Sequence, residues 1–151
     1  MTQPGGFFVL RSSAGAGKTH ALTKYWMEHA LATDDPGAYR RILALTFTNK
    51  AAGELKDRVL KRLKALATEG ELDGATTDIR DHLVAGCGLD HATIKRRSAA
   101  VFTHVLHHWG EFAISTIDAF TRRLVKPFAR DLQLDGDLEM STGARADVYR
   151  I

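Results

Sequence analysis

Eight consecutive residues near the amino end have types suited to binding a polyphosphate. They fit the pattern G-x-x-x-x-G-K-[ST] except that a serine replaces the first glycine: Ser12, Ser13, Ala14, Gly15, Ala16, Gly17, Lys18 and Thr19. The glycines allow the backbone to curl tightly, so that several N–H groups point at the same phosphates. Lys18 supplies a positive charge for the terminal phosphates, and the Thr19 hydroxyl can coordinate Mg²⁺. We therefore predict a nucleotide-binding loop.

The residues on either side of this loop predict the elements that position it. Residues 7–10 are apolar and rich in strand formers, which predicts a strand over 7–11. A helical spacing of apolar residues predicts a helix over 18–32, with Leu22, Tyr25, Trp26, His29 and Ala30 on one face. A strand, a loop over 12–17 and then a helix would place the phosphates at a helix amino terminus, where the helix dipole favours anions.

A second group of polar residues follows the apolar run Ile42–Leu45, within a strand predicted over 41–46. Thr46, Phe47, Thr48 and Asn49 would lie at the carboxyl end of this strand, where parallel α/β sheets bind ligands. Hydroxyl and amide groups can bond phosphate oxygens, and an exposed phenyl ring can stack on a base. The residues support equally well an alternative in which Phe47 is core and Thr48 only caps the next helix.

A third group follows the same logic. Residues 112–117 predict a strand, Asp118 stands at a helix N-cap position, and Phe120 follows. The helix predicted over 118–132 is basic, with Arg122, Arg123, Lys126 and Arg130. Two strand ends of this kind would form one surface with hydroxyls, aromatic rings and positive charge, which suits a single-stranded nucleic acid.

The remaining elements complete an α/β pattern. A helix over 49–67 carries an apolar stripe that predicts core positions, namely Ala52, Leu55, Val59, Leu63 and Leu66. Its other faces are rich in lysine and arginine, which is more often a solvated face than a nucleic-acid contact. Two further helices, over 77–85 and 91–109, are predicted between the second and third strands. Strands that alternate with helices predict a parallel sheet with crossover helices.

Composition sets broader bounds. The 151 residues suit one domain, with 44% hydrophobic and 26% charged residues. A net charge of +3 is only a mild lean towards polyanions. No apolar run is long enough to span a bilayer, the first residues lack a signal-peptide pattern, and a single cysteine suits a reducing compartment. We therefore expect a cytoplasmic protein that does not enter a membrane.

Three blocks in this order resemble the superfamily 1 DNA helicases of the UvrD/Rep type, particularly the RecB/AddA-like branch. They are Ser-Ala-Gly-Ala-Gly-Lys-Thr, Leu-Thr-Phe-Thr-Asn-Lys-Ala-Ala and Ser-Thr-Ile-Asp-Ala-Phe. The resemblance covers roughly residues 7 to 132, although 68–110 carry little of it. It implies the amino-terminal part of a RecA-like motor domain, with about three strands of its sheet, a helical insertion over 69–110 and the start of a truncated region over 133–151.

The resemblance also implies roles for the three groups of residues. Lys18 would contact the β and γ phosphates of ATP, and Thr19 would hold Mg²⁺. Single-stranded DNA would contact the second and third groups, which are Thr46, Phe47, Thr48, Asn49, Thr116, Asp118 and Phe120. Phe47 is the foremost stacking ring among them. The implied activity is ATP-dependent unwinding or translocation in DNA repair or recombination, with another component of a helicase–nuclease as a possible partner.

The sequence lacks an apolar strand that ends in Asp-Glu, the Walker B feature that phosphoryl transfer requires for Mg²⁺ and water. The later motifs of such helicases are also missing, so we expect this chain to bind nucleotide but to hydrolyse little of it alone. The alternative is a stand-alone module that binds nucleotide or single-stranded nucleic acid without motor activity. A small kinase is a poorer fit, because it has no use for Thr-Phe-Thr-Asn-Lys-Ala-Ala.

Other chemistry-bearing residues carry weaker patterns. His104 and His108 lie four residues apart, as do Cys87 and His91, but neither pair has the two further ligands of a closed zinc site. Metal binding is therefore not expected there. Trp26 and Trp109, both in helical patterns, are expected in the core.

Overall fold

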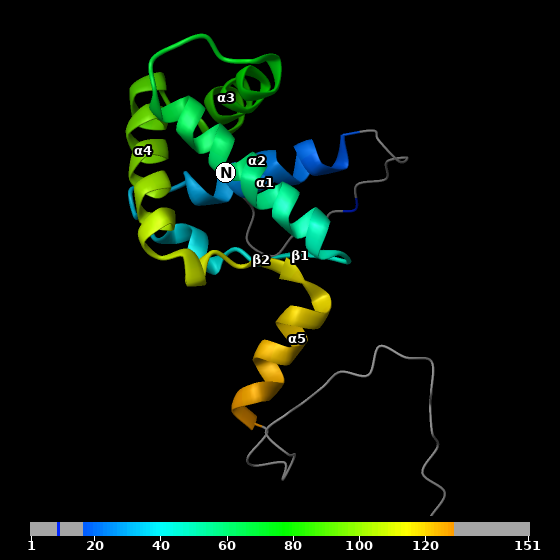
Figure 1. The fold of residues 1–151 in the computed structure, drawn as a ribbon. Coiled ribbons are helices and arrows are strands. Elements are labelled where there is room, and N and C mark those ends of the chain that lie inside the picture. Colours follow the sequence, from blue (N-terminus) through cyan, green and yellow to red (C-terminus); the bar gives the residue numbers. More distant parts are fainter. Residues whose placement is uncertain (1–8, 10–16, 129–151) are drawn as a thin grey trace, which may run out of the picture. The chain divides into compact units, whose positions relative to one another are not determined.

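The computed structural model describes residue 9 and residues 17–128. The chain divides after Thr116 into two compact units. Along the first unit lie α1 (Lys18–Ala30), η1 (Ala38–Arg41), β1 (Ala44–Thr46), α2 (Asn49–Ala67), α3 (Gly74–Cys87), α4 (His91–His107), η2 (Trp109–Glu111) and β2 (Ile114–Thr116). The second unit contains α5 (Ile117–Val125) and η3 (Lys126–Phe128). Figure 1 shows the helices of the first unit gathered on one side of its two strands.

The described sheet consists of β1 and β2, which pair in parallel. In this register Ala44 lies opposite Ile114, and Thr46 lies opposite Thr116. The chain between the strands crosses over through α2, α3 and α4, as the alternating pattern predicts. The first predicted strand, over 7–11, lies outside the described residues apart from Val9. The fold is therefore a mostly helical α/β fragment built on two parallel strands.

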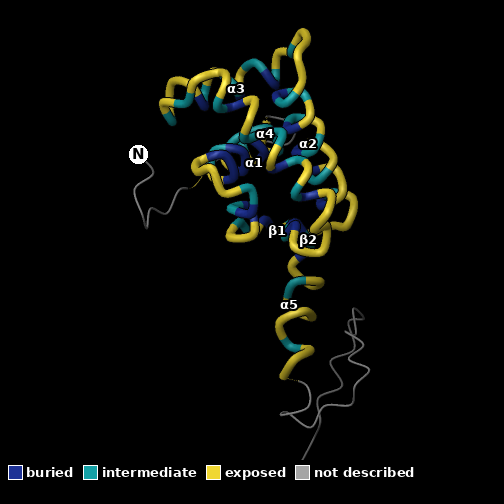
Figure 2. Tube along the Cα trace, turned by 90° about the vertical axis from the view of Figure 1, so that its left-hand side faces the viewer, coloured by how far each residue is buried: buried dark blue, intermediate teal, exposed yellow. Residues whose placement is uncertain are grey.

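The core is centred on α2. Its five predicted core positions are all buried, and Val59 and Leu63 are fully shielded from solvent. The helix begins where the Thr48 side chain accepts a hydrogen bond from the Ala51 amide, which satisfies one of the free N–H groups of the first turn. Residues of the other three long helices complete this core, namely Trp26, Met27, Ile79, Leu83, Ile94, Val101 and Val105. Figure 2 shows these buried positions along the facing sides of the helices.

Residues 69–110 contain two helices with well-defined ends. Asp73 and Asp90 cap α3 and α4 through their carboxylates, which accept hydrogen bonds from the amides of Thr76 and Thr93. The α3 helix starts at Gly74, three residues earlier than predicted, because Asp73 caps it there. It ends at Gly88, whose φ of 66° is the left-handed conformation that glycine adopts without steric penalty.

The structure corrects three further expectations. The predicted strand over 41–46 is shorter, because residues 38–41 form a 3-10 turn before β1. On α1 the buried face is Thr23, Trp26, Met27 and Ala30, whereas Leu22 and Tyr25 are partly exposed. Trp109 is not a core residue: 46% of its surface is exposed, because it precedes β2 in the 3-10 turn η2 rather than extending α4.

Candidate functional site

The start of α1 has the features of an anion site. Gly17 occupies the N-cap position with a φ of 83°, and a Cβ there would be strained in this left-handed backbone. No side chain caps the helix among the described residues, and its first turn contains no acidic residue. Backbone N–H groups at the amino end of a helix, followed by Lys18 and Thr19, fit a phosphate group with its Mg²⁺.

Only part of the predicted nucleotide loop can be placed. Gly17, Lys18 and Thr19 belong to the described residues, and they stand at the loop-to-helix junction that the sequence predicts. Ser12, Ser13, Ala14, Gly15 and Ala16 lie outside the described residues. The Thr19 carbonyl accepts a hydrogen bond of 2.7 Å from the Thr23 hydroxyl, which binds the first turn of α1 to the second.

The carboxyl ends of the two strands bring Thr46 and Thr116 together. These residues are direct partners in the parallel register. The Thr46 hydroxyl donates to the Thr48 carbonyl oxygen at 3.1 Å and lies 3.5 Å from the Ser115 carbonyl oxygen. Its proton is therefore used to hold the turn after β1, and its oxygen is left as an acceptor. Thr116 is buried, so it supports this edge rather than forming its outer surface.

Phe47 lies on the surface at this edge. It exposes 88% of its area, which excludes the alternative that it is a core residue. The other half of that alternative is confirmed, because Thr48 does cap α2. The Thr48 hydroxyl accepts from the Ala51 amide at 3.1 Å and can still donate its own proton to a ligand. Asn49 is exposed as the first residue of α2. The turn after β1 thus presents a ring, a hydroxyl and an amide to solvent.

The third predicted group spans the boundary between the two units. Asp118 and Phe120 belong to the second unit, whereas Thr116 closes the first. Asp118 is the second residue of α5 rather than its N-cap, because the helix starts directly after β2 at Ile117. Its carboxylate lies in the first helical turn, where the helix dipole favours a negative charge. Arg122 and Arg123 are exposed on the last turns of α5.

Two basic side chains of α2, Arg62 and Lys56, have well-defined partners within the fold. Arg62 bonds both carboxylate oxygens of Asp73 and the Thr76 hydroxyl, and it holds the pKa of Asp73 well below its usual range. The Lys56 ammonium lies over the Trp109 ring, 5.2 Å from its centre. For Arg62 and Lys56 these contacts favour the structural interpretation, in which the side chain stabilises the fold.

The histidines and the cysteine also have structural surroundings. The rings of His104 and His108 stack at 4.1 Å, and His104 Nδ1 lies 3.1 Å from the Tyr39 hydroxyl. Within the described part of the chain, no three histidine, cysteine or carboxylate side chains cluster in a way that could hold a metal. Burial raises the pKa of the Cys87 thiol, which makes it a poorer nucleophile.

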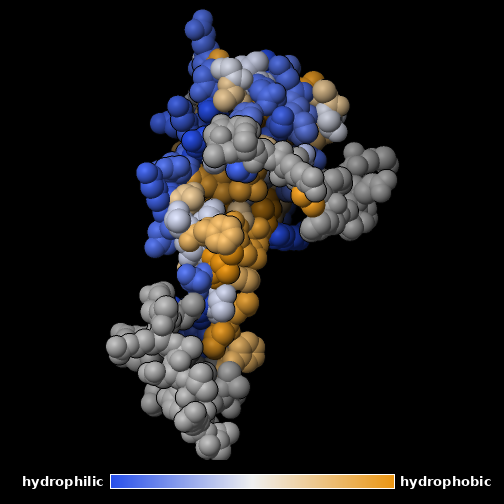
Figure 3. Space-filling view, turned by 90° about the vertical axis from the view of Figure 1, so that its right-hand side faces the viewer, coloured by the Kyte–Doolittle hydropathy of each residue, from blue (hydrophilic) through white to orange (hydrophobic). Residues whose placement is uncertain are grey.

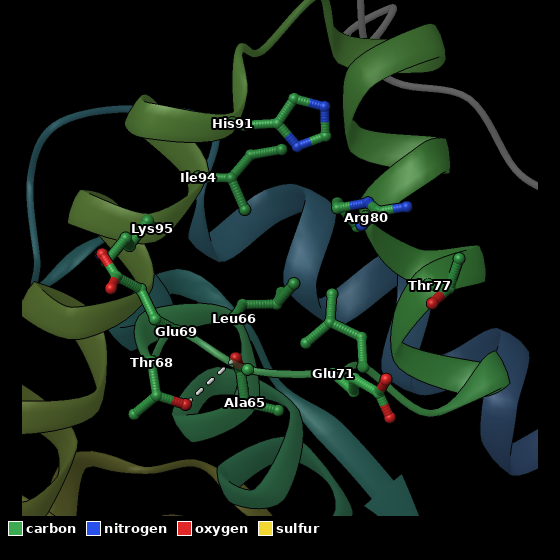
Figure 4. A pocket seen from close by; sticks show the side chains of 12 residues that line it. Ala65, Leu66, Thr68, Glu69, Glu71, Thr77, Arg80, His91, Ile94 and Lys95 are labelled. Carbon is green, nitrogen blue, oxygen red and sulfur yellow. Dashed lines mark hydrogen bonds and ion pairs between the residues drawn. The ribbon is translucent and has the colours of Figure 1, made fainter.

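A separate cavity lies away from the predicted site residues. It has a volume of about 560 Å³ and lies between the end of α2 and the helices α3 and α4 (Figure 4). Its walls combine the acids Glu69 and Glu71 with the bases Arg80 and Lys95, and Lys95 is paired with Glu69. Charges of both signs, already partly paired, give this cavity no preference for an anion or a cation.

The described fold and the start of α1 define the class: a mostly helical α/β fragment whose first helix follows a nucleotide-loop sequence. The chain belongs to the UvrD/REP helicase N-terminal domain family, which it matches over residues 1–147. This membership implies that the two-stranded fragment is part of a RecA-like fold.

The chain matches only a short segment of each curated relative. The chain is 39% identical over 61 residues to an ATP-dependent helicase/nuclease subunit of Exiguobacterium sibiricum, covering 40% of this chain and 5% of that protein. It is 25% identical over 142 residues to the subunit of the same name from Lysinibacillus sphaericus, covering 94% of this chain and 9% of that one.

A third relative is ATP-dependent DNA helicase PcrA of Staphylococcus aureus, at 45% identity over 56 residues, which are 37% of this chain and 7% of that protein. The chain therefore spans less than a tenth of the length of these relatives. No solved structure matches it.

Among the described residues, no helix is both long and apolar enough to cross a membrane.

Proposed function

We propose that this chain is the nucleotide- and DNA-binding start of an ATP-dependent motor that moves on single-stranded DNA. Lys18 contacts the terminal phosphates of ATP, and Thr19 supplies a hydroxyl to Mg²⁺. The sequence of the preceding loop, residues 12–17, fits the phosphate-binding pattern, and we propose it as the rest of the nucleotide site. Hydrolysis of bound ATP supplies the free energy for movement, and the residues that complete hydrolysis are not among those identified in this chain.

The observation that carries the DNA-binding part is the exposed ring of Phe47. A phenyl side chain left in water forgoes about 1.5–3 kcal/mol of burial energy, so a single well-placed one suits a stacking contact. Thr48 and Asn49 beside it offer a hydroxyl and an amide to the DNA backbone. Thr46 and Thr116 pair at the strand ends of the first unit. Asp118 and Phe120, at the start of α5 in the second unit, are proposed as DNA contacts in their own right.

The test is binding of a fluorescently labelled oligothymidylate, followed by anisotropy. We expect Phe47→Ala to weaken binding by about 5- to 150-fold, which corresponds to about 1–3 kcal/mol for the loss of one stacked base. The thermal unfolding temperature should stay unchanged, because the ring is 88% exposed and contributes little to the core.

Trp109→Ala is the matched control. Trp109 is another aromatic residue at the surface, with 46% of its area exposed. It precedes the amino end of β2, whereas Phe47 follows the carboxyl end of the parallel strand β1. This variant should bind the oligonucleotide as the unchanged chain does. Equal losses in both variants would argue against a specific stacking role for Phe47.

A partner protein of helicase–nuclease type follows from the same proposal, because two of the relatives are named as subunits of such an enzyme. We propose cytoplasmic DNA repair or recombination as the process.

A further inference from the structure

Three polar side-chain contacts join α1 to α3 on successive turns of α1. Near the start of α1, Asp78 Oδ2 lies 2.7 Å from His20 Nε2 and 3.2 Å from Lys24 Nζ. Further along, Glu28 Oε2 lies 2.9 Å from His82 Nε2. All three α1 residues are spaced by four, so they form one line along the helix, and Asp78 and His82 form the matching line on α3.

Apolar packing lies beside these contacts and fixes how the helices face each other. Met27 of α1 and the α3 residues Ile79 and Leu83 are fully buried. The Tyr25 ring also meets the His82 ring edge to face, with 6.4 Å between the centres. A shift of α3 along α1 would therefore break these three contacts and disturb the packing between the two helices.

The Asp78 contact lies next to the residues proposed to bind nucleotide. His20 directly follows Thr19 in the first turn of α1, and Lys18 precedes Thr19. The hydrogen bond from His20, followed by that from Lys24, holds the pKa of Asp78 below its usual range. The carboxylate is therefore charged at neutral pH, and it anchors the first two turns of α1 from outside that helix.

We propose that Asp78 is a positioning residue for the nucleotide site, and that it couples nucleotide binding at the start of α1 to the packing of α3. This inference rests on the proposed function, because it takes Lys18 and Thr19 as the nucleotide contacts. By linkage the coupling is reciprocal: a nucleotide that requires the anchored first turn also stabilises the contact between α3 and α1.

Simple electrostatics predicts the opposite effect of removing the Asp78 charge on nucleotide affinity, so the direction of the change in affinity decides between the two roles. Asp78 is a negative charge near a site for a polyanion, and repulsion alone would make its removal strengthen nucleotide binding. A positioning role makes the same removal weaken binding, because the first turn of α1 loses its anchor. The direction of the change in affinity therefore separates the two roles.

The experiment titrates the 151-residue chain with a fluorescent ADP analogue and Mg²⁺. We expect Asp78→Asn to raise the dissociation constant by about 1.5- to fivefold, the range set by an exposed ion pair. Asp81→Asn removes the same charge from α3, but Asp81 pairs with Arg80 of its own helix. That control should bind as the unchanged chain does, and Asp78→Glu should restore most of the affinity.

Hydrogen exchange of the α3 amides gives a readout that a loss of stability alone would not produce. In the unchanged chain the nucleotide should slow exchange over residues 74–87, and in Asp78→Asn this slowing should disappear. Unchanged or tighter nucleotide binding by Asp78→Asn would overturn the role of Asp78. So would equal hydrogen exchange of the α3 amides in the unchanged chain with and without nucleotide. If the unchanged chain binds no better than Lys18→Ala, the proposed function fails as well.

Discussion

Lys18 is the residue on which the nucleotide proposal depends most directly. It follows Gly17 at the amino end of α1, where the helix has no acidic residue in its first turn. A lysine ammonium binds phosphate as a compact point charge, and charged hydrogen bonds of this kind contribute about 1.5–3 kcal/mol.

We expect Lys18→Ala to weaken binding of Mg²⁺ and a fluorescent ATP analogue by about 10- to 150-fold, because it removes that charged contact. Equilibrium titration by fluorescence measures the change. Lys64→Ala, at an exposed position in the last turn of α2, removes an equal charge and should bind normally. Similar binding by both variants would show that the nucleotide does not occupy the start of α1.

His104 gives the fold a dependence on pH. Burial is the main cause that lowers its pKa below 6.5, and the neighbouring charges of His108 and Arg40 act in the same direction. Glu111 and Asp35 oppose this shift with smaller effects. Because the pKa is lower in the folded state, the unfolded chain binds the proton more readily. The stabilising contribution is therefore complete above pH 6.5 and is lost as the pH falls through the lower, folded-state pKa.

We expect the free energy of unfolding to fall as the pH drops below about 6.5, and His104→Gln to flatten this dependence. Denaturant unfolding at several pH values between about 5 and 8 measures it. His107→Gln changes an exposed histidine of the same helix and should keep the original slope. A slope unaffected by His104→Gln would assign the dependence to other groups.

At the scale of elements, α2 organises the first unit. Its apolar positions recur every three or four residues, so they form one continuous stripe against α1, α3 and α4. Leu63 is fully buried in the middle of this stripe. It belongs to the core cluster that also contains residues of α1, α3 and α4, so its truncation would leave a cavity in this core.

We expect Leu63→Ala to lower the free energy of unfolding by about 2–5 kcal/mol, the range for deleting a buried leucine. Urea denaturation followed by helical circular dichroism measures this loss. Arg58→Ala, on the exposed face of α2, should change stability by less than about 0.5 kcal/mol. A small effect of Leu63→Ala would mean that α2 is not the centre of the core.

At the scale of the whole molecule, the described sheet is short and is covered on one side. Ala44 and Ile114 are buried, whereas Leu43 and Leu45 remain exposed. Figure 3 shows that apolar side chains also reach the surface of the first unit on the side in view. The two strands end in Thr46 and Thr116, so neither described strand ends in the acidic residues that hydrolysis requires.

We therefore expect the 151-residue chain to bind ATP but to hydrolyse it slowly. Its turnover rate should be at least about a hundredfold below the roughly 10 s⁻¹ that is typical of enzymes. A coupled assay for released phosphate, with and without single-stranded DNA, measures the rate. The Lys18→Ala variant provides the background. Turnover at the rate of an intact helicase would contradict this expectation.

The sequence by itself determined the features that depend on local order. The stripe of α2, the crossover between parallel strands and the family all follow from residue types at fixed spacings, whereas the sequence left the cap at Thr48 open as one of two alternatives. The buried face of α1 was only partly predicted, because Leu22 and Tyr25 are as apolar as the residues that are buried. Which side of a helix faces the core depends on the elements that pack against it.

Only the tertiary structure decided contacts between residues far apart in the chain. It excluded a core position for Phe47, exposed Trp109, and brought Asp78 to His20 and Lys24 across more than fifty residues. No periodicity encodes such contacts, because the sequence pattern around an aspartate on a helix is the same whether the side chain faces solvent or another helix. Spacing along the chain fixes which residues share a face, and packing between elements decides what that face meets.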